Sequence, residues 1–242
     1  MYWLEQTCAD VPPDNDWLGV GEAACLNALR IPKRRADWRL GRWTAKRAVS
    51  ICLNVPSVPR SLAALEIRPA ASGAPEVFLY NQPAAVTISL SHSNGTALCA
   101  VAPPGTELGC DLEAIEPHSE AFVADYFTSD ERVLIARASA ADRLRLATLL
   151  WSAKESALKA LREGLRLDTR SVTVRLPEGA PPSAPDDMAT APTFTECRSN
   201  WRPLEVHCAS GQVFQGWWGQ TGNLLQTAVA APAPARPILL QT

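Results

Sequence analysis

The chain has 242 residues, of which 47% are hydrophobic, so it can form one large or two small packed units and most of it is not disordered. Its 23 Lys and Arg against 25 Asp and Glu give a net charge of −2, which argues against non-specific nucleic-acid binding as its main role. The seven cysteines contain no CxxC pair and fit neither a disulfide framework nor a zinc ribbon.

The sequence shows no membrane or targeting segment. No apolar run approaches the roughly 20 residues of a membrane span. The first residues, Met1 to Glu5, lack the basic start and apolar stretch of a signal peptide. We therefore expect a soluble cytoplasmic protein with reduced thiols and with neither a membrane nor a nucleic-acid partner.

The first predicted element is an amphipathic helix that begins at Pro32 and stops before Pro56. Small and apolar residues recur in it at helical spacing: Trp38, Gly41, Ala45, Val49 and Cys52. A strand-rich block with Gly-containing turns follows. Its predicted strands are Leu65 to Arg68, Glu76 to Tyr80, Val86 to Leu90, Ala97 to Ala102 and Leu108 to Leu112.

Two consecutive helices are predicted after this block. Thr128 and Glu131 have the spacing of a capping box, and Ser139 and Asp142 repeat it. A shorter helix and a longer one, ending near Gly164, are therefore expected. Further strands are predicted at Val172 to Leu176, Glu205 to Cys208, Val213 to Trp218 and Leu224 to Ala230.

An internal similarity indicates the domain organisation. The segment from Trp43 to Val49 resembles the one from Trp151 to Ala157, and both lie in predicted helices that strands follow. A weaker match, between 95–102 and 222–230, falls in the same order. Two matches in order favour a duplicated α+β unit with a cleft between its halves. The expected parts are 1–105, 106–232 and a loose tail over 233–242, with Pro177 to Pro192 as a surface loop.

Asp111 and Glu113 form a candidate metal-binding pair. Alternate residues of a strand share a face, so the two carboxylates lie side by side while Cys110 and Leu112 point the other way. Such a pair repels itself unless a cation or a proton intervenes, and Mg²⁺ prefers one or two carboxylates plus substrate phosphate oxygens. The alternative interpretation is an exposed edge strand with solvated acids.

Glu155 and Lys159 lie one turn apart on the same face of the longer predicted helix. The alternative to a functional role is an ordinary ion pair between residues four apart, which many helices contain. Trp151, Leu158 and Leu161 give the helix a buried face, which we expect to lie near the acidic strand.

His92 lies at the end of a strand, in the segment Ser89 to Ser93, next to an Asn94-Gly95 turn. The imidazole among hydroxyl groups suits contact with a phosphate, and a purely structural histidine is the main alternative. Nucleophilic catalysis by a Ser/His pair is disfavoured, because adjacent strand residues point to opposite faces. His118 and His207 have no partner at a suitable spacing and are interpreted as structural.

Basic residues crowd one short region of the first predicted helix. They are Lys33, Arg34, Arg35, Arg39, Arg42 and Lys46. This concentration indicates either a site for a multiply charged anion or a solvated helix face. The sequence lacks GxxxxGKS and GxGxxG motifs, so a phosphate would be held by side chains and metal rather than by a P-loop or Rossmann turn.

Three segments together resemble the motifs of the 4′-phosphopantetheinyl transferases of the surfactin-synthetase-activating type. They are Ser-Leu-Ser-His-Ser at 89–93, Gly-Cys-Asp-Leu-Glu at 109–113 and Trp-Ser-Ala-Lys-Glu-Ser-Ala-Leu-Lys at 151–159. The stretch 34–46 is similar to the basic helix of that family, so the resemblance covers most of 30–230. It implies a pseudo-dimer of two similar α+β subdomains with the active site in the cleft between them.

The resemblance also implies a reaction. The 4′-phosphopantetheine group of coenzyme A is transferred to a serine of an apo acyl or peptidyl carrier protein, 3′,5′-ADP is released, and Mg²⁺ binds the diphosphate. Asp111, Glu113 and Glu155 would hold the metal. Glu155 would deprotonate the carrier serine directly or through water, and Lys159 would stabilise the diphosphate and the departing phosphate. The implied contacts of the coenzyme A phosphates are Ser91, His92, Lys46 and Arg39 or Arg42.

One departure from the family pattern concerns coenzyme A binding. After the Ser72-Gly73 turn the family often has Gly-Lys-Pro, whose lysine helps to hold a phosphate, whereas this chain has Ala74. We therefore expect binding to depend more on Arg34, Arg35 and Lys46.

Two other classes of function are compatible with the same residues. A Mg²⁺-dependent phosphohydrolase or nucleotidyl transferase would use the carboxylates without needing a carrier protein. A non-enzymatic α+β protein-binding module would carry them as surface charge. If the protein is the transferase, its partner is an acidic helical carrier that docks near the junction of the halves, and a monomer is favoured because the halves satisfy each other's interface.

Overall fold

The structure is a computed structural model that describes residues 1–177 and 201–241. The predicted loop from Pro177 to Pro192 lies outside the described residues, except for Pro177 itself. The helices are α1 (Val20–Ala28), α2 (Pro32–Cys52), α3 (Pro59–Ala64), α4 (Glu120–Tyr126), α5 (Ser129–Arg137) and α6 (Ala140–Ala160), with 3-10 turns η1 (Cys8–Asp10), η2 (Gly164–Arg166) and η3 (Thr169–Ser171).

The strands are β1 (Tyr2–Thr7), β2 (Leu65–Pro69), β3 (Pro75–Leu79), β4 (Gln82–Pro83), β5 (Thr87–Ser93), β6 (Thr96–Ala102), β7 (Glu107–Ala114), β8 (Val172–Arg175), β9 (Arg202–Cys208), β10 (Val213–Thr221), β11 (Leu224–Ala231) and β12 (Ile238–Leu239). They form three sheets, and helices pack against the two larger ones. The predicted α+β class is therefore confirmed.

The N-terminal part of the chain, together with β12 from the C-terminal end, builds a four-stranded sheet in the order β12-β1-β6-β5, with α2 against it. Helix α2 begins with Pro32, whose fixed φ suits the first helical position and whose missing N–H costs nothing there. Its small residues Ala45, Ala48 and Val49 are fully buried, which lets the helix approach the sheet closely. A small sheet, β2-β3-β4, packs beside α2 and β5.

The C-terminal part builds an antiparallel five-stranded sheet in the order β7-β11-β10-β9-β8, with α6 packed across β7 and β11. The predicted capping box is present at α5, where the Thr128 N–H donates to Glu131 Oε2 (2.9 Å). At α6 the Ser139 hydroxyl accepts from the Asp142 N–H (3.1 Å). Both helix starts therefore lie where the capping signals in the sequence predicted them.

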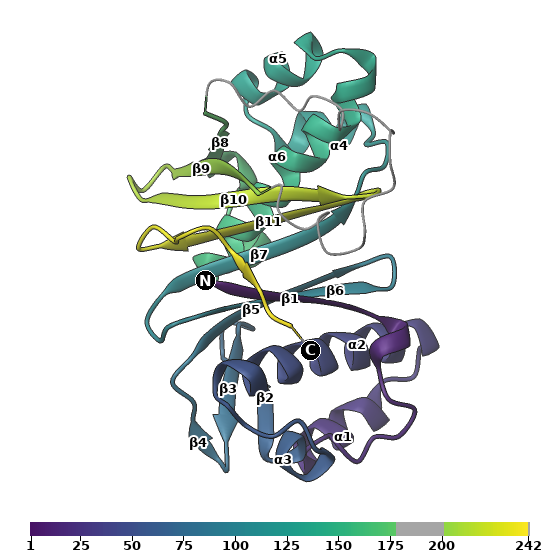
Figure 1. The fold of residues 1–242 in the computed structure, drawn as a ribbon. Helices are drawn as coiled ribbons and strands as arrows, with labels where there is room; N and C mark the ends of the chain where they lie inside the picture. The colour runs from purple at the N-terminus through teal and green to yellow at the C-terminus, as the bar shows by residue number, and fades with distance from the viewer. Residues whose placement is uncertain (178–200, 242) are drawn as a thin grey trace, which may run out of the picture.

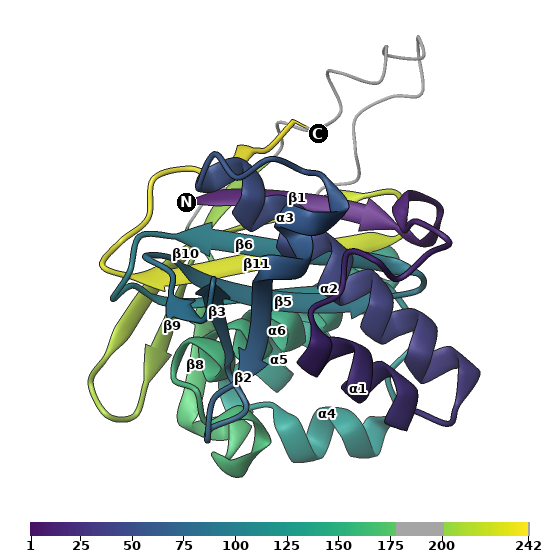
Figure 2. The same cartoon turned by 90° about the horizontal axis from the view of Figure 1, so that it is seen from below.

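Strands β5 and β7 bring the two larger sheets together in the middle of the molecule (Figure 1). Helices α1, α2 and α3 lie at one end of this arrangement, and α4 and α5 lie at the other. Figure 2 views the molecule from the side of α1, α2 and α3, with α2 crossing the four-stranded sheet. An apolar cluster joins the two sheets and includes Trp3, Leu98, Leu112, Trp201 and Ala228.

A buried lysine holds α2 in place. Lys46 has no exposed side-chain surface, and its Nζ lies 2.5 Å from Glu22 Oε2. The same ammonium donates to the carbonyl oxygens of Trp17 (3.0 Å) and Leu62 (2.8 Å). Glu22 in turn accepts from the Gly19 N–H at the start of α1 (3.0 Å). We call Lys46, Glu22, Trp17 and Leu62 the Lys46 cluster.

A second buried lysine holds α6 in the same way. Lys154 is fully buried, and its Nζ lies 2.9 Å from Glu131 Oε2 and 2.8 Å from the Thr169 carbonyl oxygen. The Lys154 Nζ lies 5.9 Å from the ring of Phe127, and the Lys46 Nζ lies 5.9 Å from the ring of Trp17. We call Lys154, Glu131, Phe127 and Thr169 the Lys154 cluster.

The two ends of the chain differ from the sequence-based expectation. Residues 233–242 were expected to form a loose tail, but β12 pairs in parallel with β1 and Leu240 packs into the core beside α2. Residues 238–240 are held because β1, which the sequence analysis did not predict, offers them a free edge. In the described residues, no helix is both long and apolar enough to cross a membrane.

Candidate active site

The candidate site lies where β5 faces β7. The Ser89 hydroxyl accepts a hydrogen bond from the Cys110 N–H (2.9 Å), and the Ser91 hydroxyl donates to Asp111 Oδ1 (2.8 Å). These bonds join the two strands through side chains rather than through a shared backbone ladder. The serines at positions 89 and 91 therefore fix the acidic strand against the N-terminal sheet.

Gly109 allows α6 to lie directly on β7. A Cβ atom built at Gly109 would lie 1.7 Å from the Ser156 carbonyl oxygen, a distance that no side chain permits. The close approach brings Glu155 and Lys159 to the strand that carries the carboxylates. The prediction that this helix lies near the acidic strand is confirmed by the packing of α6 on β7.

Asp111 and Lys159 form the central ion pair of the site. The Lys159 Nζ lies 2.7 Å from Asp111 Oδ1 and donates to the Cys110 carbonyl oxygen (3.1 Å). Burial is the largest single influence and would lower the pKa of Lys159, but the charge and hydrogen bond of Asp111 together with the charges of Cys110 and Glu155 outweigh it and raise the pKa above its ordinary value. The lysine is therefore a fixed positive charge beside the carboxylates.

Glu113 lies on the same face of β7 as Asp111, as strand alternation predicted. Trp151 Nε1 donates to Glu113 Oε1 (3.1 Å) and orients the carboxyl group. Burial, and after it the negative charge of Asp111, raises the pKa of Glu113 to about 7. Burial and the neighbouring carboxylate together therefore let Glu113 hold its proton near neutral pH.

Glu155 completes the acidic group. Burial raises its pKa first, and the charge of Asp111 raises it further. Glu155 Oε1 and Asp111 Oδ2 are both buried, and neither has a hydrogen-bond partner among the described residues. Unpaired buried carboxylate oxygens are costly, so the site calls for a cation or a donor that these residues do not supply.

A hard divalent cation fits this donor set. Mg²⁺ takes oxygen ligands, and it is usually held by one or two carboxylates together with water and substrate phosphates rather than by a closed protein cage. In the described part of the chain, no three His, Cys, Asp or Glu side chains converge closely enough to enclose a metal by themselves. The open, partly unpaired arrangement of Asp111, Glu113 and Glu155 matches the substrate-completed type of site.

A pocket of about 260 Å³ opens beside this group. One wall is the 72–75 turn, another is β5, and the end of α6 supplies Lys159 and Arg162. Ala74 lines the pocket. The position at which the 4′-phosphopantetheinyl transferases often have a lysine therefore faces this pocket. Lys159 belongs both to this pocket and to the acidic group, and therefore connects them.

The structure does not support the predicted contact of Lys46 with coenzyme A. Its side chain is completely buried, and Glu22 and two carbonyl oxygens surround its ammonium group. Burial lowers the pKa of Lys46, and Glu22 partly restores it. The residue stabilises the fold, and its position in a basic stretch of sequence gave no sign of its burial.

The remaining basic residues of α2 are used in several ways. Arg39 Nη2 donates to the carbonyl oxygens of the 12–14 segment, and Arg35 Nη1 donates to that of Leu29 (3.1 Å). The Arg42 guanidinium lies 5.0 Å from the Trp38 ring, with its Nε 3.9 Å from Glu22. Among the described residues, no hydrogen bond joins Arg39 or Arg42 to Asp111, Glu113 or Glu155. Lys33 and Arg34 are exposed.

The three histidines lie apart from one another. His92 is exposed on β5, next to Ser91 and Ser93. His118 stacks on Phe122 with ring centroids 4.6 Å apart, and its Nε2 lies 3.3 Å from the Thr148 hydroxyl. His207 pairs with Glu205 (3.0 Å).

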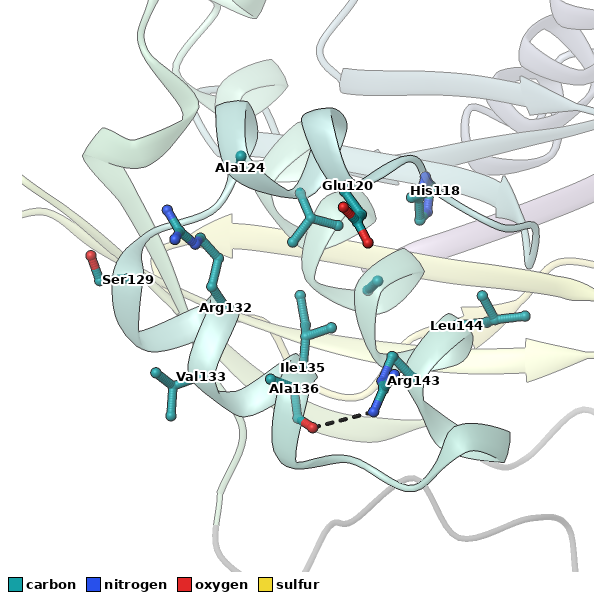
Figure 3. Close-up of a pocket in the computed structure, with 12 residues that line it drawn as sticks. His118, Glu120, Ala124, Ser129, Arg132, Val133, Ile135, Ala136, Arg143 and Leu144 are labelled. Atoms are coloured by element: carbon teal, nitrogen blue, oxygen red, sulfur yellow. Dashed lines mark hydrogen bonds between the residues drawn. The ribbon is translucent and has the colours of Figure 1, made fainter.

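A larger cavity, of about 670 Å³, lies between α4, α5 and α6 (Figure 3). Val123, Ile135 and Leu144 give it apolar walls, and Arg132 and Arg143 add positive charge. Neither the carboxylates nor Lys159 line it. The cavity is therefore separate from the candidate active site.

Sequence reasoning missed two contributors to the site. Ser89 belongs to the 89–93 segment that the sequence singled out, but it was given no role there. Arg162 reaches the site from a loop position, where basic residues are too common to stand out. Trp151 was recognised only as an apolar anchor, although its Nε1 also orients Glu113. Only the proximity of β5, β7 and the end of α6 identifies these roles.

Residues 107–205 match the family model of the ACPS 4′-phosphopantetheinyl transferase superfamily. A search of curated proteins finds no match for the chain. The matched segment begins with β7, includes α4, α5, α6 and β8, and ends within β9. It contains all three carboxylates and Lys159, and it confirms the predicted resemblance at the level of the superfamily. The part of the chain that carries the acidic strand and α6 is therefore similar to the 4′-phosphopantetheinyl transferase superfamily.

Proposed function

We propose that the protein transfers the 4′-phosphopantetheine group of coenzyme A to a serine of an apo acyl or peptidyl carrier protein, releases 3′,5′-ADP and requires Mg²⁺. One observation carries this proposal: β7 and α6 of the matched segment bring together three carboxylates and a lysine, namely Asp111, Glu113, Glu155 and Lys159. Two buried oxygens of these carboxylates have no hydrogen-bond partner among the described residues. Such a site suits a metal-bound diphosphate better than a purely structural role.

Asp111, Glu113 and Glu155 would hold the metal. Bound Mg²⁺ would neutralise charge on the diphosphate of coenzyme A and on the leaving 3′,5′-ADP. Ser91 fixes Asp111 through its hydroxyl, and Trp151 fixes Glu113 through its indole N–H, so the two carboxylates of β7 are oriented before any ligand arrives.

Glu155 would remove the proton from the carrier serine, directly or through one water. Its raised pKa makes it a better proton acceptor than an exposed glutamate. The serine oxygen then attacks the phosphorus that carries the pantetheine arm, and the bond to the 3′,5′-ADP oxygen breaks. Lys159 stabilises the charge that develops on the departing phosphate.

Ser91, His92 and Arg42 would contact coenzyme A phosphates from the N-terminal half. His92 is exposed beside Ser91 and can turn towards a bound phosphate. Arg42 and Arg39 each keep a buried Nε without a hydrogen bond among the described residues. Arg39 is held by the 12–14 segment and is the weaker candidate of the two arginines.

The pseudo-dimer and its boundaries, 1–105 and 106–232, belong to the same proposal. Glu22 accepts from the Ile67 N–H (3.0 Å) on β2, and Glu131 accepts from the Val174 N–H (3.0 Å) on β8. The recurrence of one buried lysine, one glutamate and one such strand contact in each half supports a duplicated unit. The site then lies where the halves meet.

The test is intact-mass spectrometry of an apo carrier protein incubated with this protein and coenzyme A. We expect the carrier to gain one phosphopantetheine group with Mg²⁺ and none with excess chelator. Release of 3′,5′-ADP without any carrier would indicate a phosphohydrolase instead. No mass gain across acyl and peptidyl carriers, together with no binding of coenzyme A, would contradict the proposal.

A further inference from the structure

Arg162 has a strained backbone conformation next to the proposed site. It follows α6 with a φ of 58°, in the left-handed region that residues other than glycine rarely adopt. Gly164 takes a similar φ of 52° two residues later without strain. The Arg162 side chain is exposed, and no hydrogen bond or ion pair holds it among the described residues. The left-handed conformation closes the end of α6, because the Arg162 N–H donates to the Lys159 carbonyl oxygen (3.0 Å) and the Glu163 N–H donates to that of Leu158 (3.1 Å). The backbone at Arg162 is therefore held by the fold, while its side chain, beside the pocket, is left unpaired in the described part of the chain.

The pocket that Arg162 lines is suited to an anion. Its charged lining residues are Lys159 and Arg162, and no acid lines it. Thr87 and Ser89 add hydroxyl groups on the β5 side. Lys159 is already paired with Asp111, so Arg162 is the lining cation without a partner in the described chain. A planar guanidinium can bind a phosphate through two parallel hydrogen bonds.

We propose that Arg162 binds the ribose 3′-phosphate of coenzyme A and thereby selects coenzyme A over dephospho-coenzyme A. This inference rests on the proposed function and names a binding residue for its donor substrate. Lys159 lies three residues earlier, at the end of α6, and is tied to the carboxylates where the diphosphate would bind. Arg162 lies two residues beyond the end of α6 and lines the same pocket as Lys159. Arg162 therefore reaches a second phosphate of the same ligand, on the side away from the carboxylates.

Replacement of Arg162 by glycine tests ligand binding without disturbing the fold. Glycine accepts a φ of 58° without strain, so Arg162→Gly removes the cation and should not lower the Tm. Calorimetric titration in Mg²⁺ should show coenzyme A binding weakened by about 10-fold or more, as expected for loss of a charged hydrogen bond. Binding of dephospho-coenzyme A should change by less than about twofold. Arg162→Lys keeps the charge but not the two parallel hydrogen bonds, so it should lose less coenzyme A affinity than Arg162→Gly.

The possible outcomes distinguish this inference from the proposed function. Unchanged coenzyme A affinity in Arg162→Gly, an equal loss for both ligands, or an equal loss in Arg162→Lys would each overturn the assignment of Arg162. In those cases the wild-type protein still transfers phosphopantetheine and the proposed function stands. If the wild-type protein neither binds coenzyme A nor modifies a carrier, the proposed function fails and this inference fails with it.

Discussion

Helices α2 and α6 are each held by a buried lysine–glutamate ion pair, but the residue that follows the lysine differs between the two helices. Lys46 of α2 and Lys154 of α6 are both fully buried, each against a glutamate from a neighbouring helix. Lys154 is followed by Glu155, which lies in the acidic group, whereas Lys46 is followed by Arg47, which lies over the ring of Trp43 (5.8 Å).

The same contrast appears one turn later. Lys159 of α6 pairs with Asp111, whereas the corresponding residue of α2, Ile51, packs against the apolar core. What the two helices share stabilises the fold, and what they do not share forms the candidate active site. The difference teaches that basic residues of equal appearance in sequence have separate roles, which only burial and partners reveal.

Replacement of Glu155 by glutamine is expected to have the largest effect on activity. The amide keeps the size of the side chain but cannot accept the serine proton, so turnover should fall by about 10²–10⁴-fold. The rate of carrier modification measures this, and the Tm reports on folding. The matched control is Arg47→Gln at the corresponding position of α2, which should change the rate by less than about threefold. Near-normal turnover of the Glu155 variant would refute its role.

Replacement of each buried lysine by methionine should reduce stability by similar amounts. Lys46→Met leaves Glu22 buried without its cation, and Lys154→Met does the same to Glu131, which costs about 3–5 kcal/mol in each case. Urea unfolding measures the loss. The double variant Lys46→Met with Glu22→Gln should be more stable than Lys46→Met alone, because Glu22 then carries no buried charge, for which Arg42 at 3.9 Å would be the remaining partner.

The variant Lys46→Met also shows whether Lys46 stabilises the fold or binds coenzyme A. At temperatures where the protein is folded, Lys46→Met should bind coenzyme A within about twofold of the wild-type protein, because its ammonium touches only the Lys46 cluster. A large and selective loss of coenzyme A affinity would restore the role that the sequence suggested for this lysine.

Replacement of Ser91 by alanine is expected to have the smallest effect. It removes the hydroxyl that donates to Asp111 Oδ1 and leaves the carboxylate in place. The Mg²⁺ concentration that gives half-maximal rate should rise by about 10-fold, as is typical when a residue that orients a ligand is lost. An unchanged Mg²⁺ requirement would show that Ser91 does not position Asp111.

The sequence predicted the elements whose signals are local. Capping residues indicated α5 and α6, and alternation placed Asp111 and Glu113 on one face of β7 with Cys110 and Leu112 buried on the other. The apolar periodicity of the helix also predicted that α6 lies near the acidic strand. These features depend on neighbours within a few residues, and the physical rules for helices and strands act at that range.

Features that depend on distant partners were not predictable. Strand β1 lacks clear alternation, because both Trp3 and Leu4 are buried, and β12 is too short to give any signal. Lys46 was assigned to the coenzyme A phosphates because it lies in a basic stretch that resembles the family's basic helix, and its buried partner Glu22 is too distant in sequence to be recognised. Neither the composition nor the spacing of residues predicts the left-handed backbone conformation of Arg162.

The most direct test of the central claim is the Mg²⁺ dependence of coenzyme A binding, measured by calorimetry in the wild-type protein and in Asp111→Asn. The account predicts that Mg²⁺ strengthens binding to the wild-type protein by about 10-fold or more and leaves binding to the variant unchanged. Equal affinity with and without Mg²⁺ in the wild-type protein, or full enhancement in the variant, would contradict a metal site formed by β7 and α6.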